Sequence, residues 1–526
     1  MNKSKYYIAY FIISVLLMHL SVFAQMSSAE VDQLVEQAMQ KFNVAGVAVG
    51  IVKDGKIIHS KGYGVKSIKT KAAVDAHTNF DIASNTKAFT TTALAMLVEE
   101  GKISWQTKVA DVIPEFKMYN PYVTANFNIQ DLLTHRSGLG LGAGDLMFWP
   151  DSNDFTMKDV LTNFQYFEPV SPFRTKYDYD NVLYVVAGEV IARVSGIPWD
   201  QFINTRILQP LGMDQTYVNF FEVKDKGSLA LPHSTDPSPI HVIRRDVFDP
   251  EKINGAAATI ISNVDDLSRW MLLHLNHGKY GDNLEKQLFS EKSQGEMWKI
   301  HTTIKSDPNP RYNSHFHGYG LGWHLEDVDG KMSVSHTGGL AGMLSRTVMI
   351  PDLNLGVVVL TNTWYGGAYL FRAVSNTIVD SYLNLDNYDW IADYYKRQQK
   401  SLGHADSVVT EVWEKVNTTT NDAINVQDYI GVYEDNWFGK VEVFMNSGQL
   451  WFKCYRSPKL NGPMHYYQAN TFAIRWEYQD TNCDAFAIFS LDENGKADRI
   501  RMKGISPNID FSYDFQDLDL HRIRIE

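Results

Sequence analysis

The sequence contains little cysteine, carries no excess of positive charge and has only one long uncharged apolar stretch. Among its 526 residues the only cysteines are Cys454 and Cys483. Two thiols alone are too few for a zinc site, and no histidine lies beside them at metal-ligand spacing. Export would permit a disulfide between them, but the sequence does not fix their separation. The net charge of −12 argues against nucleic acid or anionic lipid as a partner.

The one long uncharged stretch lies at the N-terminus. Lys3 and Lys5 precede residues 6–24, which contain no Lys, Arg, Asp or Glu. Small residues stand just before Gln25, where a signal peptidase requires them, so we expect residues 1–24 to be a secretory signal peptide. An uncleaved membrane anchor is the alternative. Cleavage removes two lysines and no acid, which leaves a periplasmic or extracellular chain of net charge −14, with no integral membrane segment expected.

The next part of the chain alternates between strand-like and helical patterns. Two β-rich runs flank Asp54-Gly55 within residues 45–64, which predicts a hairpin. Helical patterning dominates from about residue 84 to 274. Strand patterns return at 331–339 and, around a Pro-Asp turn, at 343–363. Strands at both ends with helices between them predict an α+β domain, in which distant segments close one antiparallel sheet beside a helical lobe.

The residue pattern changes in the C-terminal part of the chain. The polar stretch at 416–428 predicts a linker. Beyond it, alternating runs with Asn-Gly and Ser-Gly turns predict a small all-β domain, either a sandwich or a barrel. We therefore divide the mature chain into an α+β domain at 25–400, a linker at 401–424 and the all-β domain at 425–526. The sequence leaves the oligomeric state open.

The first candidate site pairs Ser84 with Lys87. An extended apolar segment precedes Ser84, and Phe89, Ala93 and Met96 form one face of a helix after it. Lys87 therefore lies one turn beyond Ser84, on the same side of a helix N-terminus. An unprotonated lysine can take a proton from the serine hydroxyl, and burial favours that form. Taken alone, the lysine is more simply a solvated charge.

The second and third candidate sites lie further along the chain. Tyr179 and Asn181 precede a helix that is predicted to end at Gly196, and they can point a phenol and an amide into one cleft. The simpler interpretation is a packed aromatic residue and a helix cap, and Tyr382 and Asn384 repeat the same pattern elsewhere.

The third site closes a strand-like run with His336, Thr337, Gly338 and Gly339. Glycines at that place allow a substrate backbone to lie against the strand edge. The amide of Gly339, together with that of Ser84, could form an oxyanion hole. A plain glycine-rich hairpin is the alternative.

Ser-x-x-Lys, Tyr-x-Asn and His-Thr-Gly in this order resemble the serine β-lactamase and penicillin-binding-protein superfamily, specifically its class C β-lactamase-like branch of esterases and D-amino-acid peptidases. The resemblance extends over residues 31–380 and includes "IQDLLTHRSGLG" (129–140) and the strand pair around 343–363. The C-terminal part resembles the lipocalin-like barrel appended to many such hydrolases. The implied fold is a β-lactamase/transpeptidase-like domain, an antiparallel sheet plus a helical lobe, followed by a small barrel.

The resemblance also implies a role for each residue. Ser84 is the acylated nucleophile, Lys87 its general base and Tyr179 the proton relay, while Asn181 contacts substrate. His336 replaces the lysine of the family's Lys-Thr-Gly motif, and Thr337, Gly338 and Gly339 complete that edge. An imidazole attracts a substrate carboxylate less than a permanent ammonium does, which weakens the case for a β-lactamase.

The expected function is hydrolysis through an acyl-enzyme on Ser84, with small-molecule esters, short peptides containing D-residues, or β-lactams as substrates and with no cofactor. A β-lactamase or penicillin-binding DD-peptidase is the first alternative, and an exported binding protein without catalysis is the second. His315 and His317 lack an acidic partner at ligand spacing and are interpreted as polar surface residues. Phe148 and Trp149 are candidates for the cleft mouth or for the core.

Overall fold

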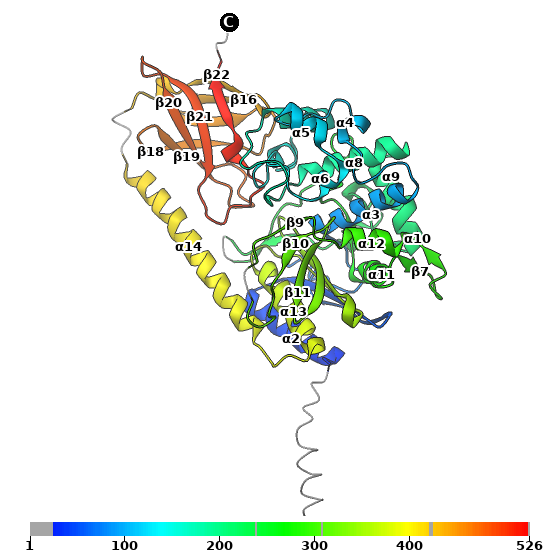
Figure 1. Ribbon diagram of the computed structural model, residues 1–526. Helices are drawn as coiled ribbons and strands as arrows, with labels where there is room; N and C mark the ends of the chain where they lie inside the picture. The colour runs from blue at the N-terminus through cyan, green and yellow to red at the C-terminus, as the bar shows by residue number, and fades with distance from the viewer. Residues whose placement is uncertain (1–24, 237–238, 307–308, 420–423, 524–526) are drawn as a thin grey trace, which may run out of the picture.

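The computed structural model describes residues 25–236, 239–306, 309–419 and 424–523, so the predicted signal peptide at 1–24 lies outside the described residues. Figure 1 shows two units: a large sheet-and-helix unit with a helical lobe, and a barrel coloured orange to red. A long helix, α14 (Trp390–Thr418), runs along one side from the large unit to the barrel.

The central sheet has eight strands in the order β2-β1-β14-β13-β12-β11-β10-β9, and every neighbouring pair is antiparallel. Val49 of β1 pairs with Val359 of β14, which confirms that distant segments close the sheet. The strands are β1 (Gly46–Lys53), β2 (Lys56–Gly64), β9 (Thr302–Thr303), β10 (His317–Tyr319), β11 (His324–Val328), β12 (Lys331–Leu340), β13 (Met343–Ile350) and β14 (Leu355–Thr361).

Helices cover both faces of this sheet, which is why β1 is buried over nearly its whole length. Alternate residues of β1, such as Val47 and Val49, pack with α2 (Ser28–Phe42) and α13 (Gly366–Leu383). Ala48 and Val52 belong to the opposite cluster, which includes α11 (Val264–Leu275). The period of two along the strand thus assigns each side chain to one helical layer.

The helical lobe lies between β2 and β9 in the chain and is built around α3 (Thr86–Glu99). Phe89, Ala93 and Met96 were expected to form one apolar face, but every residue from 86 to 97 is buried, because α3 is the central helix of the lobe. The other helices of the lobe are α4 (Val109–Val112), α5 (Pro121–Asn126), α6 (Ile129–Leu133), α7 (Met157–Asn163), α8 (Val182–Ser195), α9 (Trp199–Ile203), α10 (Gln209–Leu211) and α12 (Glu291–Met297).

Short two-stranded pairs tie the lobe together. They join β3 (Phe80–Asp81) to β6 (Ile261–Ser262), β4 (His233–Ser234) to β5 (His241–Val242), and β7 (Lys279–Tyr280) to β8 (Lys286–Gln287). The first pair places the segment before Ser84 beside the segment that follows Ala257.

The C-terminal unit is a closed eight-stranded barrel, so the barrel is confirmed and the sandwich is excluded. Tyr433 of β15 pairs with Arg522 of β22, which closes the ring. Its strands are β15 (Gly431–Asp435), β16 (Gly439–Asn446), β17 (Gln449–Cys454), β18 (Asn461–Gln468), β19 (Thr471–Ile474), β20 (Ala485–Leu491), β21 (Ala497–Gly504) and β22 (Asp519–Arg522).

The predicted linker and the two cysteines belong to this region. Residues 401–418 of the linker are part of α14. The helix has buried positions at Gln398, Ala405 and Val412, and Val412 packs against the barrel, so a sparse apolar stripe stabilises it despite its polar composition. Cys454 and Cys483 are both free thiols, and both are buried.

Candidate active site

Ser84 lies at the turn that connects β3 to α3. It belongs to a short 3₁₀ turn, η1 (Ala83–Asn85), from which α3 continues directly. Ala83, just before it, has a φ of 47°, in the left-handed region that a residue with a side chain seldom adopts. Ser84 is partly exposed while both its neighbours are buried, so the turn presents its hydroxyl to the cavity.

Lys87 is fully buried and directs its amine back toward Ser84. Its Nζ lies 3.0 Å from the Ser84 Oγ, 2.7 Å from the Asn181 Oδ1 and 3.1 Å from the Ala257 carbonyl oxygen. Burial lowers the pKa of Lys87 to about 7, although Asp145 and Asp180 act in the opposite direction.

These three contacts define how a neutral Lys87 amine is oriented. Asn181 Oδ1 and the Ala257 carbonyl can only accept hydrogen bonds, so they take the two N–H hydrogens of the neutral amine. The remaining lone pair then points to the Ser84 hydroxyl, which can donate to it. The geometry therefore suits removal of a proton from Ser84.

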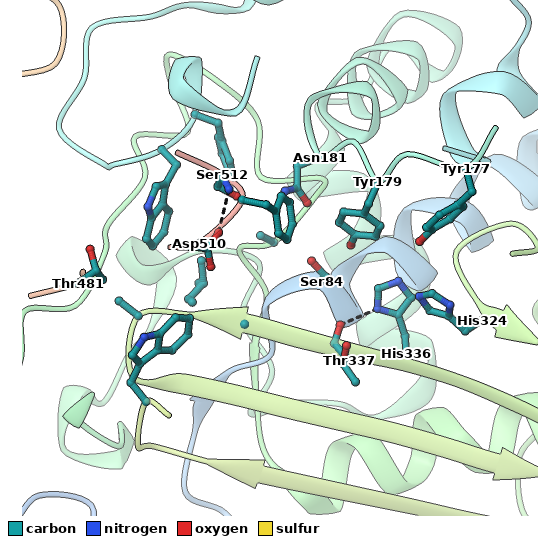
Figure 2. Close-up of a pocket in the computed structure, with 18 residues that line it drawn as sticks. Ser84, Tyr177, Tyr179, Asn181, His324, His336, Thr337, Thr481, Asp510 and Ser512 are labelled. Carbon is teal, nitrogen blue, oxygen red and sulfur yellow. Dashed lines mark hydrogen bonds between the residues drawn. The ribbon is translucent and has the colours of Figure 1, made fainter. Parts of the chain in front are cut away.

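Tyr179 and Asn181 reach the same cavity from the segment before α8. Figure 2 shows the Tyr179 phenol directed toward Ser84. Its ring packs against that of His135 in a tilted arrangement, with 4.2 Å between the centroids, and His135 itself is buried. Burial raises the pKa of Tyr179 well above its usual value, while the Ser84 hydroxyl nearby acts in the opposite direction. The phenol is therefore neutral and able to donate a proton.

The edge of β12 forms the opposite wall. β11 pairs with β12 only from Lys331 to Ser335, so the segment His336–Gly339 has an edge that β11 does not cover. A Cβ built on Gly338 would lie 2.1 Å from the Ile82 carbonyl oxygen, which shows how closely β12 passes the Ser84 turn. Thr337 and Gly339 line the cavity, whereas Gly338 serves this close approach.

His336 is buried and hydrogen-bonded on both ring nitrogens. Its Nδ1 lies 2.7 Å from the Thr337 carbonyl oxygen, to which only an N–H can donate, and its Nε2 lies 2.8 Å from the Tyr319 hydroxyl. Burial, helped by His324 and Lys87, lowers the pKa of His336 well below its usual value. The imidazole is therefore neutral near pH 7 and supplies no fixed positive charge.

The cavity between these elements has a volume of about 270 Å³ (Figure 2). Phe148 and Trp149 line it and also belong to the buried core, so both of their predicted locations apply. Among the described residues that line it there is no Lys or Arg, and Lys87 is buried next to Ser84. The lining residues are Ser84, Phe148, Trp149, Tyr177, Tyr179, Asn181, Ala258, His324, His336, Thr337, Gly339, Leu340, Ala341, Trp364, Thr481, Asp510, Phe511 and Ser512.

Residues of the barrel unit also line this cavity, a contribution that the sequence motifs do not predict. Asp510, Phe511 and Ser512 come from the loop between β21 and β22, and Thr481 comes from the loop before β20. The Phe511 ring meets the Tyr179 ring edge-on at 5.7 Å between centroids. No motif marks these residues, because their place depends on how the barrel docks against the lobe.

His315 and His317 do not line the cavity, whereas His324 does. His315 is exposed and its Nδ1 lies 3.2 Å from the Asp327 carboxylate, while the His317 Nε2 lies 3.3 Å from the His324 Nδ1. Within the described ranges, no group of three or more His, Cys, Asp or Glu side chains could hold a metal ion.

Among the described residues, no single helix is both long enough and apolar enough to span a membrane. Two consecutive helical segments, Val182–Ser195 and Trp199–Leu211, would together be long and apolar enough to span a membrane, but the chain bends by 75° between them.

Known families match both units of the chain. The sequence model of the Beta-lactamase family matches residues 31–376. A domain of unknown function, DUF3471, matches residues 415–522, which include the barrel. The first match covers the sheet, the helical lobe and every motif residue named above.

Similar proteins of known name include hydrolases. The chain is 27% identical over 392 residues to the unguisins hydrolase ungD' of Aspergillus campestris, covering 70% of this chain and 68% of that protein. It is 26% identical over 439 residues to unguisins hydrolase ungD of Aspergillus violaceofuscus, covering 79% and 76%. Protein flp of Staphylococcus aureus strain MW2 is 26% identical over 353 residues, covering 64% and 63%.

Solved structures share the fold. The octameric penicillin-binding protein homologue from Pyrococcus abyssi superposes with a TM-score of 0.58 at 19% identity, covering 94% of this chain and all of that one. A class C β-lactamase from Rhodobacter sphaeroides gives 0.53 at 18% identity, covering 67% and 99%. Because the family model matches residues 31–376, this chain belongs to the Beta-lactamase family of serine hydrolases, and it carries a C-terminal β-barrel.

Proposed function

We propose that this protein is an exported serine hydrolase that forms an acyl-enzyme on Ser84 and acts on esters or short peptides, including peptides with D-residues. The observation that carries the proposal is the 3.0 Å contact between the Ser84 Oγ and the buried Lys87 Nζ. Because burial lowers the pKa of Lys87 to about 7, a large fraction of the amine is unprotonated at neutral pH. The uncharged N-terminal stretch supports export.

In the first half-reaction the Ser84 Oγ attacks the substrate carbonyl carbon while Lys87 accepts the hydroxyl proton. The backbone amides of Ser84 and Gly339 stabilise the resulting oxyanion, a contribution of about 3 kcal/mol for one such donor. The bond to the leaving group then breaks while Tyr179 gives its proton to the departing oxygen or nitrogen and receives the proton that Lys87 took from Ser84. An ester bond now joins the acyl group to Ser84.

In the second half-reaction a water molecule attacks the acyl carbon and gives its proton to the Lys87–Tyr179 pair. The second tetrahedral intermediate collapses, the bond from Ser84 to the acyl carbon breaks, and the proton returns to the Ser84 oxygen. The free acid leaves, and the enzyme regains its starting protonation state.

The electrostatics of the cavity favour substrates without a carboxylate beside the scissile bond. The lining residues include no Lys or Arg, and burial keeps the imidazole of His336 neutral. One acidic side chain, Asp510, is among the described lining residues; burial raises its pKa, and it supplies no positive charge for an anion in either protonation state. These features support neutral esters or peptides over penicillin-like acids and peptides that end in a carboxylate. The relatives named unguisins hydrolase support hydrolysis in general.

Intact-mass spectrometry tests the proposal. Wild-type protein is incubated with a panel of aryl esters and with a fluorophosphonate probe, and the adduct is located by peptide mapping. We expect one adduct on Ser84 in the wild type and none in Ser84→Ala. Wild-type protein that forms no adduct would contradict the proposal and support a non-catalytic binding protein. Faster turnover of a chromogenic cephalosporin than of the esters would support a β-lactamase instead.

A further inference from the structure

A buried carboxyl group beside the active site has no part in the mechanism above. Asp145 begins the short turn η2 (Asp145–Met147), and its side chain is 1% exposed. Its Oδ2 accepts hydrogen bonds from the Asn181 Nδ2 and the Ser512 Oγ, each at 2.8 Å. Its Oδ1 has no partner within the part of the chain that the structure describes. No sequence motif marks this residue.

Asp145 belongs to a continuous chain of contacts that runs from the barrel to the nucleophile. Ser512 donates to Asp145, and Asn181 donates to the same carboxyl oxygen. On its other side, Asn181 accepts from the Lys87 Nζ at 2.7 Å, and that amine lies 3.0 Å from the Ser84 Oγ. The first link comes from the barrel and the rest from the hydrolase unit.

We propose that Asp145 is a positioning residue that fixes the Asn181 amide against Lys87, and that Ser512 of the barrel holds the Asp145 carboxyl group in place. The inference rests on the proposed role of Lys87 as base. Burial raises the pKa of Asp145 to about 7, and above that pH its carboxylate only accepts hydrogen bonds, so it selects the NH₂ end of the amide and turns the carbonyl oxygen toward the lysine. That oxygen takes one N–H of the neutral amine and leaves its lone pair on Ser84.

The loop that carries Asp145 is held from both sides. The Gly142 amide donates to the Tyr179 carbonyl at 2.8 Å, which ties the loop to the catalytic segment. The Asp514 carboxyl group of the barrel loop accepts from the Gly144 amide at 2.7 Å and from the Leu146 amide at 2.9 Å. Docking of the barrel therefore fixes the backbone on either side of Asp145 through Asp514 and places the Ser512 hydroxyl against the Asp145 carboxyl group.

This role couples the barrel to the protonation of the site. The titratable groups that face Asp145 are Lys87 on α3, Tyr179 and Asp180 before α8, and Asp510 and Asp514 on the barrel loop. Negative charge on Asp145 raises the pKa of Lys87. Removing that charge lowers the pKa of Lys87, so the amine becomes neutral at a lower pH.

The test compares Asp145→Asn, Ser512→Ala and the double variant, using the kcat and KM of an ester and the rate of fluorophosphonate labelling across pH. Asp145→Asn keeps the shape of the side chain but no longer dictates the orientation of Asn181. We expect it to lower kcat by about tenfold and to move the acid limb of the pH profile to lower pH. We expect Ser512→Ala to lower kcat by about threefold.

The double variant distinguishes a chain of contacts from two independent effects. If both residues act through Asn181, the double variant loses about as much as Asp145→Asn alone, instead of the product of the two losses. Ser457→Ala is the matched control, because Ser457 is a buried barrel serine whose hydroxyl has no hydrogen-bond partner among the described residues. We expect this control to keep the kcat and pH profile of the wild type.

Each outcome decides between the proposals. Wild-type kcat and an unmoved acid limb in both single variants would overturn the role of Asp145, as would losses that simply multiply. If Asp145→Asn does not fold, Ser512→Ala against Ser457→Ala decides the question. A wild-type protein that forms no Ser84 adduct overturns the proposed function, and this inference with it. Normal labelling of the wild type with unchanged variants overturns this inference alone.

Discussion

Because Lys87 is buried, we expect the free energy of unfolding, as well as the activity, to depend on pH. An ordinary lysine has a pKa of 10.5, and burial in the folded protein lowers that of Lys87 to about 7. Between these values the unfolded chain binds one proton that the native chain does not. The free energy of unfolding therefore rises with pH, by about 1.4 kcal/mol for each pH unit.

The comparison variant is Lys87→Met, which removes the amine and keeps an unbranched side chain of similar length. Between about pH 8 and pH 10, the stability of the wild type relative to this variant is expected to rise by about 3 kcal/mol. The window lies above pH 8 because burial raises the pKa of Asp145 to about 7. Below about pH 7 the native protein keeps a proton on Asp145 that the unfolded chain has lost, so the contribution of Asp145 makes the free energy of unfolding fall as pH rises.

Urea unfolding followed by tryptophan fluorescence measures this difference at each pH. Lys102→Met is the matched control, because Lys102 is 44% exposed and lies just beyond the end of α3. We expect this control to follow the pH dependence of the wild type. A constant difference between wild type and Lys87→Met across the window would refute the argument, because the amine would then be protonated in the folded protein and unable to take a proton from Ser84.

Three further substitutions test individual elements of the site. Tyr179→Phe should lower kcat for an amide by about a hundredfold or more and leave KM nearly unchanged, since it removes the proton relay; equal kcat in stopped-flow assays would contradict that role. His336→Lys should shift the ratio of kcat/KM values toward substrates that carry a carboxylate, and an unchanged ratio would show that this edge does not contact the carboxylate. Gly338→Ala should lower Tm by several degrees and abolish activity, because the new Cβ would lie 2.1 Å from the Ile82 carbonyl oxygen. Gly403→Ala is the control: nothing lies within 4 Å of its added Cβ outside the helix's own backbone, so the Tm and the activity of the wild type should be retained.

The barrel loop and Asp145 show what could not be predicted from sequence. Asp145 and Ser512 are 367 positions apart in the chain and share a hydrogen bond. No periodicity or turn signal connects them, because their contact depends on the docking of two separately built units. The same limit applies to α3: its sequence indicated a helix, but its burial on all sides follows from the lobe that surrounds it. The helical form of residues 401–418 depends in part on packing against the barrel.

The sequence by itself determined the local elements and the chemistry available to them. The Asp54-Gly55 hairpin, the strand pair around 343–363, the helix that begins after Asn181 and ends at Gly196, and the barrel strands all follow from turn residues and hydrophobic period, which act over a few neighbouring positions. Only the tertiary structure decided that Lys87 is buried, that the imidazole of His336 is neutral and that a barrel loop lines the cavity beside Ser84. These properties depend on burial and on contacts between distant segments, which exist only once the whole chain has packed.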